Sequence, residues 1–398
     1  MTQRVAVVGG GIIGTTVARA ILRRDPGVAV TVFEKEPAVA AHQTGHNSGV
    51  VHAGLYYEPG SLKARLCRRG GLLLREFCRE KDLPYEECGK VVVAQDAAES
   101  VRLEGIAKRA VANGVEGVRM LDAAELRRRE PHVRGIQALL SPVTAITDFT
   151  AVTRAVARDV EESGGEVRLS TEVRGMTRRG AEVVVRTSDD EEAFDFVIGC
   201  AGLQSDRVAE MAGDGPEPKI IPFRGDYYAL VPERRDLVNG LVYPVPDPRY
   251  PFLGVHATPR VDGEVLLGPN AFLALSREGY RWGDVSAGDL LDVLRYRGFR
   301  RFARRHWRTG VAELRRSTSR RAFVAQARLL LPDVRPADVV RVASGVRAQA
   351  LEPTGEMVDD FRLVRTDRTM SVRNAPSPAA TSSMAIAEHI LAELGTPW

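Results

Sequence analysis

The chain is poor in long apolar segments, in cysteines and in aromatic residues. It has 398 residues, of which 6% are aromatic and four are cysteines. No window reaches the roughly 18 consecutive apolar residues of a transmembrane helix, and we expect no secretory signal at the start. The cysteines form no C-x-x-C pair, which argues against a disulfide framework and against a thiolate metal site. We therefore expect a protein of the reducing cytoplasm that carries no metal.

The overall charge is small as well. The balance of 56 basic and 52 acidic residues is +4, too mild to indicate a nucleic-acid-binding protein. The exception is residues 295–321, where eleven arginines and one glutamate give +10 and leave −6 for the rest. This segment is either a solvated helix face or a surface for anionic lipid at the inner face of a membrane. Nucleic acid is not expected there, because the aromatic residues should pack inward: Tyr296, Phe299, Phe302 and Trp307.

The first 34 residues read as a strand, a helix and a second strand. The turn after the first strand has the spacing G-x-G-x-x-G, with Gly9, Gly11 and Gly14, and Glu34 ends the second strand. In this context the spacing predicts a dinucleotide site. The glycines let the backbone approach a pyrophosphate, and Glu34 can accept hydrogen bonds from a ribose. We expect cofactor contacts from these residues and from Ile12, Ile13 and Lys35.

The rest of the chain predicts an α/β fold (α+β overall). Helical periodicity covers 62–81, 97–113, 123–130, 148–163 and 286–306, and a last helix spans 379–394. Strands are expected at 166–169, 182–186 and 194–199, and the alternation over 219–270 predicts an antiparallel sheet. We predict a discontinuous dinucleotide domain of residues 1–85, 150–215 and 340–398, interleaved with a substrate domain of residues 86–149 and 216–339.

A long loop follows Glu34. The glycine motif alone leaves NAD and FAD open, but residues 42–49 are dense in glycines and short hydrogen-bond donors. Such a loop suits a pyrophosphate and a ribityl chain, which favours FAD. The contacts expected from it are Thr44, His46, Asn47, Ser48 and Gly49.

At this loop the sequence resembles the L-2-hydroxyglutarate dehydrogenase/oxidase family, a group of D-amino-acid-oxidase-like flavoproteins. The blocks that carry the resemblance are residues 42–57, 59–64, 88–90, 222–227, 243–247, 251–256, 268–271, 277–280, 345–350 and 374–381. The resemblance implies a Rossmann-type FAD domain, an antiparallel-sheet substrate domain, and oxidation of L-2-hydroxyglutarate to 2-oxoglutarate. Phe149 and Ser276 depart from the pattern of the family. Further FAD contacts are expected from Val173, Ala201, Gly202, Gly345, Val346, Pro376, Ser377, Ala379, Ala380 and Thr381.

Oxidation of a 2-hydroxy acid needs a base and cations for the carboxylates. His256 is our first candidate for the base and His52 the second, whereas His42 and His46 are expected to hydrogen bond within the cofactor loop. For the carboxylates the leading candidate is Arg347, whose planar fork suits them. The further candidates are Lys90, Arg224 and Lys63, with Tyr57 and Gln349 as neutral donors. The N-terminus of the last helix would favour negative charge on the reduced flavin.

Three functions compete at this point. The first is oxidation of the 2-hydroxydicarboxylate, with electrons passed to oxygen or to a membrane quinone. The second is a flavin oxidase of another 2-hydroxy acid or of an amino acid, and two cationic anchors would favour the dicarboxylate. The third is a flavin-containing protein that binds tRNA or lipid through residues 295–321.

Overall fold

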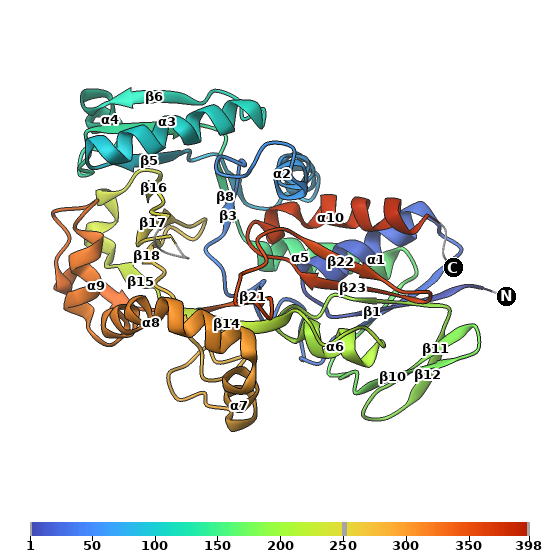
Figure 1. The fold of residues 1–398 in the computed structure, drawn as a ribbon. Coiled ribbons are helices and arrows are strands. Elements are labelled where there is room, and N and C mark those ends of the chain that lie inside the picture. Colours follow the sequence, from blue (N-terminus) through green and yellow to red (C-terminus); the bar gives the residue numbers. More distant parts are fainter. Residues whose placement is uncertain (1, 249–252, 396–398) are drawn as a thin grey trace.

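The structure is a computed structural model, and it describes residues 2–248 and 253–395. Pro251 and Phe252, which belong to one of the blocks above, lie outside the described residues. Figure 1 shows one sheet with its helices near the two termini and a second sheet on the opposite side of the molecule, with shorter strands between them. The expectation of an α/β fold with a Rossmann-type sheet is confirmed.

The dinucleotide side is built on a six-stranded sheet. Its order is β22 (Arg362–Arg365), β23 (Thr369–Asn374), β13 (Phe196–Gly199), β1 (Arg4–Val8), β2 (Ala29–Phe33) and β9 (Glu166–Arg168). The pairs from β23 to β9 are parallel, while β22 is antiparallel. The strand expected over 194–199 is two strands, because Phe194 ends β12 and Phe196 begins β13. The six strands of this sheet come from three separate parts of the chain: residues 4–33, 166–199 and 362–374.

Alternation along β1 assigns the two faces of this sheet. Val5 and Val7 belong to a core packed against helices, whereas Ala6 and Val8 pack against a small second sheet. The helices are α1 (Ile12–Arg24), α2 (Leu62–Glu80), α5 (Phe149–Glu162) and α10 (Ala379–Leu394), and α1 packs against both α5 and α10. Asp148 caps α5 as expected, accepting from the N–H of Thr150 at 2.8 Å. The small sheet holds β10 (Gly175–Arg179), β11 (Glu182–Arg186) and β12 (Glu191–Phe194); α6 (Ser205–Met211) follows β13.

The other side holds an eight-stranded sheet. Its order is β20 (Val339–Arg341), β15 (Tyr228–Leu230), β18 (Val265–Gly268), β17 (His256–Pro259), β16 (Leu241–Pro244), β5 (Lys90–Ala94), β7 (Gln137–Ser141) and β6 (Arg119–Asp122). The antiparallel expectation holds except for β16 and β5, which run parallel. Here β5 comes from a part of the chain for which no strand was predicted. Helices α3 (Ala97–Ala112) and α4 (Ala123–Arg129) follow β5 and β6.

Two three-stranded sheets complete the fold. One joins β14 (Lys219–Gly225) to β21 (Gly345–Leu351) and β19 (Phe272–Leu273), and the other holds β3 (Val50–Val51), β8 (Ala145–Thr147) and β4 (Tyr85–Glu86). The pairing of β14 with β21 over seven residues joins a strand of the predicted substrate domain to a strand of the predicted dinucleotide domain. The boundaries between these domains remain a prediction.

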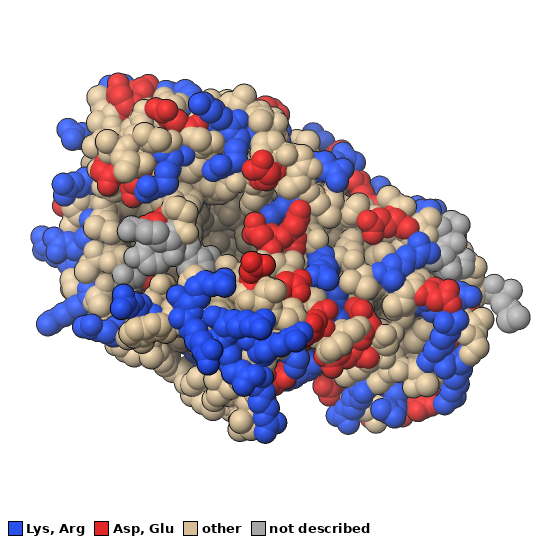
Figure 2. Space-filling view, viewed as in Figure 1, with Lys and Arg blue, Asp and Glu red and all other residues tan. Residues whose placement is uncertain are grey.

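The single helix expected over 286–306 is two helices, and the basic segment, residues 295–321, runs from the end of the first of them into a third. Helix α7 (Ala287–Arg295) ends at Tyr296, α8 (Arg297–Thr318) continues, and α9 (Arg320–Ala327) follows. The break is held by the hydroxyl of Tyr296, which donates to the carbonyl of Leu351 at 2.9 Å. Figure 2 shows basic side chains gathered over α8, beside the hollow of the molecule. Across residues 2–248 and 253–395, no helix is long and apolar enough to cross a membrane.

Candidate active site

A cavity of about 1410 Å³ opens between the two sides of the molecule. Its lining comes from the β1–α1 turn, the loop after Glu34, β17, β21 and the start of α10. Pockets for one small ligand hold about 300–1,000 Å³, so this cavity has room for a dinucleotide and a small substrate together.

The glycine turn is shaped by close backbone approach. Gly9 has φ +115°, and a Cβ on Gly14 would lie 1.9 Å from the carbonyl oxygen of Gly9. Gly11 and Ile13 line the cavity, and no hydrogen-bond partner for their N–H groups is found in the described parts of the chain. These groups open a helix of 13 residues, where N–H groups and the helix dipole suit phosphate.

Glu34 lies beside this turn, buried, with its carboxylate at the cavity. It accepts from the N–H of Gly10 at 2.7 Å and from the N–H of Glu36 at 2.9 Å. A carboxylate has about four acceptor positions, so Glu34 keeps capacity for the hydroxyls of a ribose. Val173, Ala201 and Gly202 line the same end of the cavity as Lys35.

The loop over residues 42–49 is folded by its own polar groups. Thr44 Oγ1 accepts from the N–H of Ile12 at 3.1 Å, and Asn47 Nδ2 donates to the carbonyl of Thr44 at 2.7 Å. Residues 42–44 and 46–48 line the cavity, whereas Gly49 does not, although its N–H donates to Asn47 Oδ1. The loop thus wraps the cavity where the phosphate turn faces it.

The start of α10 faces the cavity from the other end. Residues 374–381 line it, and no partner is found for the N–H groups of Ala380 and Thr381 in the described residues. Two open helix N-termini, a glycine turn that a Cβ would fill and a buried acceptor at Glu34 fit FAD: the start of α1 would hold its pyrophosphate, and the start of α10 would face its flavin ring.

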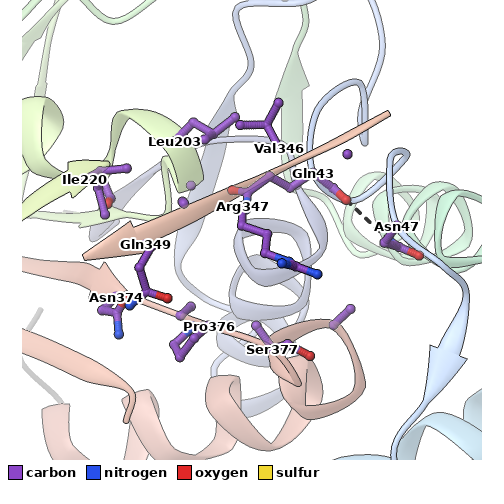
Figure 3. Close-up of a pocket in the computed structure, with 18 of the residues that line it drawn as sticks. Gln43, Asn47, Leu203, Ile220, Val346, Arg347, Gln349, Asn374, Pro376 and Ser377 are labelled. Carbon is purple, nitrogen blue, oxygen red and sulfur yellow. Dashed lines mark hydrogen bonds between the residues drawn. The ribbon is translucent and has the colours of Figure 1, made fainter. Parts of the chain in front are cut away.

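Strand β21 carries the cation that enters the cavity. Figure 3 shows Arg347 and Gln349 on one side of β21, directed toward Pro376 and Ser377 at the start of α10. Gly345 and Val346 also line the cavity. The guanidinium of Arg347 is therefore at the end where the flavin ring is expected.

His256 begins β17, a strand within residues 219–270, for which the sequence predicts an antiparallel sheet. Its Nδ1 lies 2.9 Å from the carbonyl of Gly254. A carbonyl only accepts, so Nδ1 carries the proton and Nε2 keeps its lone pair. Burial lowers the pKa of His256 to about 3, with the charges of Lys90 and Arg347 acting in the same direction. The imidazole is therefore neutral near pH 7 and able to take a proton.

Lys90 is buried behind the cavity wall. Its Nζ lies 3.8 Å from the ring centre of Tyr243 and 4.8 Å from that of Tyr56. No carboxylate pairs with it in the described residues, and burial lowers its pKa to about 7. Tyr243 in turn stacks on His256, with ring centres 4.0 Å apart. The ammonium acts on the cavity through two aromatic rings instead of lining it.

The second candidate for the base lies near the same cations. His52 lines the cavity, and burial, followed by the charges of Lys90, His256 and Lys63, lowers its pKa to about 3. Lys63 and Tyr57 also line the cavity, and Lys63 Nζ is 3.0 Å from a carboxylate oxygen of Asp359. Of the predicted cations, Lys63 and Arg347 thus reach the cavity surface directly.

Arg224 was expected to clamp substrate, but the structure turns it away from the cavity. It is buried, and its Nε donates to Asp226 at 2.8 Å. In the register of β14 with β21, Arg224 is opposite Val346, and Phe223 is opposite Arg347. Opposite residues share a face of a sheet, so a shift of one residue separates the two arginines. Of the two departures from the family pattern, Phe149 lines the cavity and Ser276 does not.

Some lining residues were missed by sequence reasoning. The aromatic ones include Tyr56, Tyr227 and Tyr243, and the polar ones include Gln43, Gln204, Glu278 and Asn374. All of these except Gln204 fall inside blocks that carried the resemblance, which was the available signal. One inward expectation was wrong: Trp307 is 59% exposed, while Tyr296, Phe299 and Phe302 are buried.

Comparison with known proteins agrees with this site. The sequence model of the family described as FAD dependent oxidoreductase (DAO) matches residues 4–394. The chain therefore belongs to the FAD-dependent oxidoreductase family, a family of flavoenzymes. Its fold resembles that of the FAD-bound L-alpha-glycerophosphate oxidase of Mycoplasma pneumoniae, with a TM-score of 0.79 at 20% identity over 98% of this chain and 94% of that one.

Within this family, the chain is similar to curated L-2-hydroxyglutarate dehydrogenases. The bovine protein, named as mitochondrial, is 43% identical over 98% of this chain and 88% of its own length. The protein of Escherichia coli (strain K12) is 42% identical over 98% and 92%. The resemblance noted from the sequence blocks is thereby confirmed.

Proposed function

We propose that the protein oxidises L-2-hydroxyglutarate to 2-oxoglutarate. The observation that carries this proposal is the pair of cations whose charges act on His256, Arg347 at the cavity surface and Lys90 behind two tyrosines, with Lys63 on the cavity wall near His52. Cations gathered in a dry cavity suit a dianion better than a monoacid. The curated relatives named above act on such a dicarboxylate.

FAD, when bound, supplies the acceptor for the hydride from the α-carbon. The protein supplies the base and the orientation. His256 Nε2 takes the proton of the 2-hydroxyl group, so the substrate loses one proton and one hydride and gains a carbonyl. Since this nitrogen has its lone pair open and the ring is held at Nδ1, His256 is oriented before substrate arrives.

Arg347 holds the carboxylate next to the reacting carbon, because it lies at the flavin end of the cavity. Lys63 and Tyr57 lie on the loop–α2 side and hold the second carboxylate, and the charge of Lys90 lies behind Tyr56 and Tyr243. A bound dianion would raise the pKa values of Lys90 and His256, because it offsets the positive charges that now lower the pKa of His256. Substrate binding thus makes His256 a stronger base. The start of α10 favours negative charge at the flavin end.

For the electron acceptor, we propose oxygen or a membrane quinone.

A contact with anionic lipid through residues 295–321 is supported by an exposed apolar stripe on α8, formed by Trp307, Val311 and Leu314. Arginines surround this stripe, which is the composition of helices that lie in a membrane interface. A cytoplasmic location is supported by the four free cysteines. Co-sedimentation with anionic liposomes tests the contact, and Trp307→Ser should weaken it if the proposal is right.

Anaerobic bleaching of the flavin tests the reaction. L-2-hydroxyglutarate should bleach the holoenzyme quickly, whereas the D-isomer and L-lactate should not. Bleaching by an amino acid or by a monocarboxylic hydroxy acid, with L-2-hydroxyglutarate inert, would replace the proposal with another flavin oxidase. His256→Gln should still bind L-2-hydroxyglutarate, but its flavin should bleach far more slowly than that of the wild type. If His52→Gln shows this loss instead, His52 is the base.

A further inference from the structure

A short segment from the substrate side lies against the cofactor loop. It comprises residues 277–280, between β19 and α7. The ring of Tyr280 stacks on that of His46, with centres 3.9 Å apart and planes at 21°. The hydroxyl of Tyr280 is 3.4 Å from His42 Nδ1. The outer side of the loop that wraps the cavity is thus covered by a residue that lies more than 200 positions further along the chain.

The same segment is tied to the cavity by charge. Lys35 Nζ donates to one carboxylate oxygen of Glu278 at 2.9 Å, and Gln204 Nε2 donates to the other at 2.9 Å. All three residues line the cavity. Burial opposes ionisation of Glu278, but the hydrogen bonds from Gln204 and Lys35 outweigh it and lower its pKa. The carboxylate is therefore charged near neutral pH.

Glu36, His42 and Glu278 lie close enough together to offer three ligands to a metal ion. However, the ammonium of Lys35 is within 3.0 Å of each of them. The positive charge that this group needs is already present, so the cluster is an ion-pair network between the two sides of the molecule.

Arg277 anchors the segment. Its side chain is 1% exposed; it forms a two-pronged ion pair with Asp206 and donates to the carbonyl of Leu203 at 2.8 Å. Asp292 accepts a further bond at 3.2 Å. A buried arginine with this many partners is rigid, so the residues that follow it are held against the cofactor loop.

We propose that residues 277–280 form a clasp that retains FAD. Glu278 and Tyr280 close the outer side of the part of the cavity lined by Glu34, Lys35, residues 42–44 and His46, and the cofactor can leave only when the clasp opens. This role does not depend on which substrate is oxidised. It assigns cofactor retention to two residues outside the nucleotide-binding segments of the chain.

The test measures the rate of FAD release from the purified holoenzyme, as the rise of free-flavin fluorescence after dilution. Tyr280→Leu removes the stacking and should speed release about three- to tenfold. Tyr280→Phe keeps the ring and should release FAD at nearly the wild-type rate. Glu278→Gln removes the charge and should speed release about two- to fivefold.

The matched control is Arg281→Ala, an exposed neighbour in the same loop, which should leave the rate unchanged. Circular dichroism of each variant checks the fold, and Glu278→Gln decides alone if Tyr280→Leu does not fold. The clasp is refuted if Tyr280→Leu and Glu278→Gln, when folded, both release FAD within twofold of the wild-type rate. It is also refuted if Arg281→Ala speeds FAD release as much as Tyr280→Leu and Glu278→Gln do.

Discussion

Replacement of Lys90 by methionine should make the protein more stable and a poorer enzyme. Lys90 is 2% exposed, and in the described chain its Nζ faces two tyrosine rings and no carboxylate. Folding therefore removes an ammonium from water without a full partner. Methionine has a similar length, fills the same space and has no charge to bury.

The size of the effect follows from the pKa of Lys90. Its decrease from 10.5 to about 7 corresponds to roughly 5 kcal/mol against the charged form, at about 1.4 kcal/mol for each pKa unit. The two ring faces return about 1 to 2 kcal/mol each. We expect Lys90→Met to raise the free energy of unfolding by about 2 kcal/mol at pH 6.

The direction in which the free energy of unfolding changes with pH follows from the pKa of Lys90. The folded pKa is lowered, so the unfolded chain binds the extra proton between about pH 7 and 10.5. Stability of the wild type therefore rises with pH across this window, and the full cost is present below it. The advantage of the variant should shrink by roughly 1 to 3 kcal/mol between pH 6 and pH 9.

Urea unfolding of the two proteins at pH 6 and pH 9 measures this difference, with the exposed Lys108→Met as control. The KM of Lys90→Met for L-2-hydroxyglutarate should rise at the same time. A variant that is less stable than wild type at pH 6, or whose advantage does not change with pH, would refute the reasoning.

Three further predictions concern the other cations and the pH profile. Arg347→Lys should lower kcat/KM by roughly 10- to 100-fold, because the two-pronged carboxylate contact is lost; unchanged steady-state kinetics would remove Arg347 from the site. Arg224→Met should lower the free energy of unfolding by about 3 kcal/mol, since it leaves the buried Asp226 with the more distant Arg341, at 4.0 Å, in place of its 2.8 Å ion pair, while kcat/KM of the folded variant stays within a few fold; a large kinetic loss would restore Arg224 as a clamp. Finally, kcat/KM should fall above about pH 7 as Lys90 loses its proton, and a flat profile from pH 6 to 9 would exclude a role for its charge.

The nucleotide half of the site could be read from the sequence because its signals are local. The glycine turn, Glu34 and the loop over 42–49 lie within 50 residues, and each type of residue is required by the chemistry of a dinucleotide. Most of the predicted helices match to within a few residues; the exceptions are the break at Tyr296 and the extension of α8 to Thr318, and α6 and α9 were not predicted. At that break the hydroxyl of Tyr296 donates to the carbonyl of Leu351, 55 residues away, a contact with no local signal. The parallel contact of β16 with β5 likewise joins segments with no local signal.

In the substrate half of the site, less could be predicted from the sequence. Arg224 and Arg347 look alike in the sequence, and the register of β14 with β21 is what turns one toward Asp226 and the other into the cavity. Lys90 could be nominated as a cation, but its position behind Tyr56 and Tyr243 depends on residues from three segments.

The sequence by itself determined that this chain folds around a dinucleotide and belongs among flavoproteins, because turn geometry and ribose recognition need particular residues at short spacing. Only the tertiary structure decided which charges face substrate, which are neutralised inside the protein and what covers the cofactor loop. Those properties arise from strand pairing and from burial, which bring together residues up to about 300 positions apart. No single segment of the chain therefore contains the information that sets them.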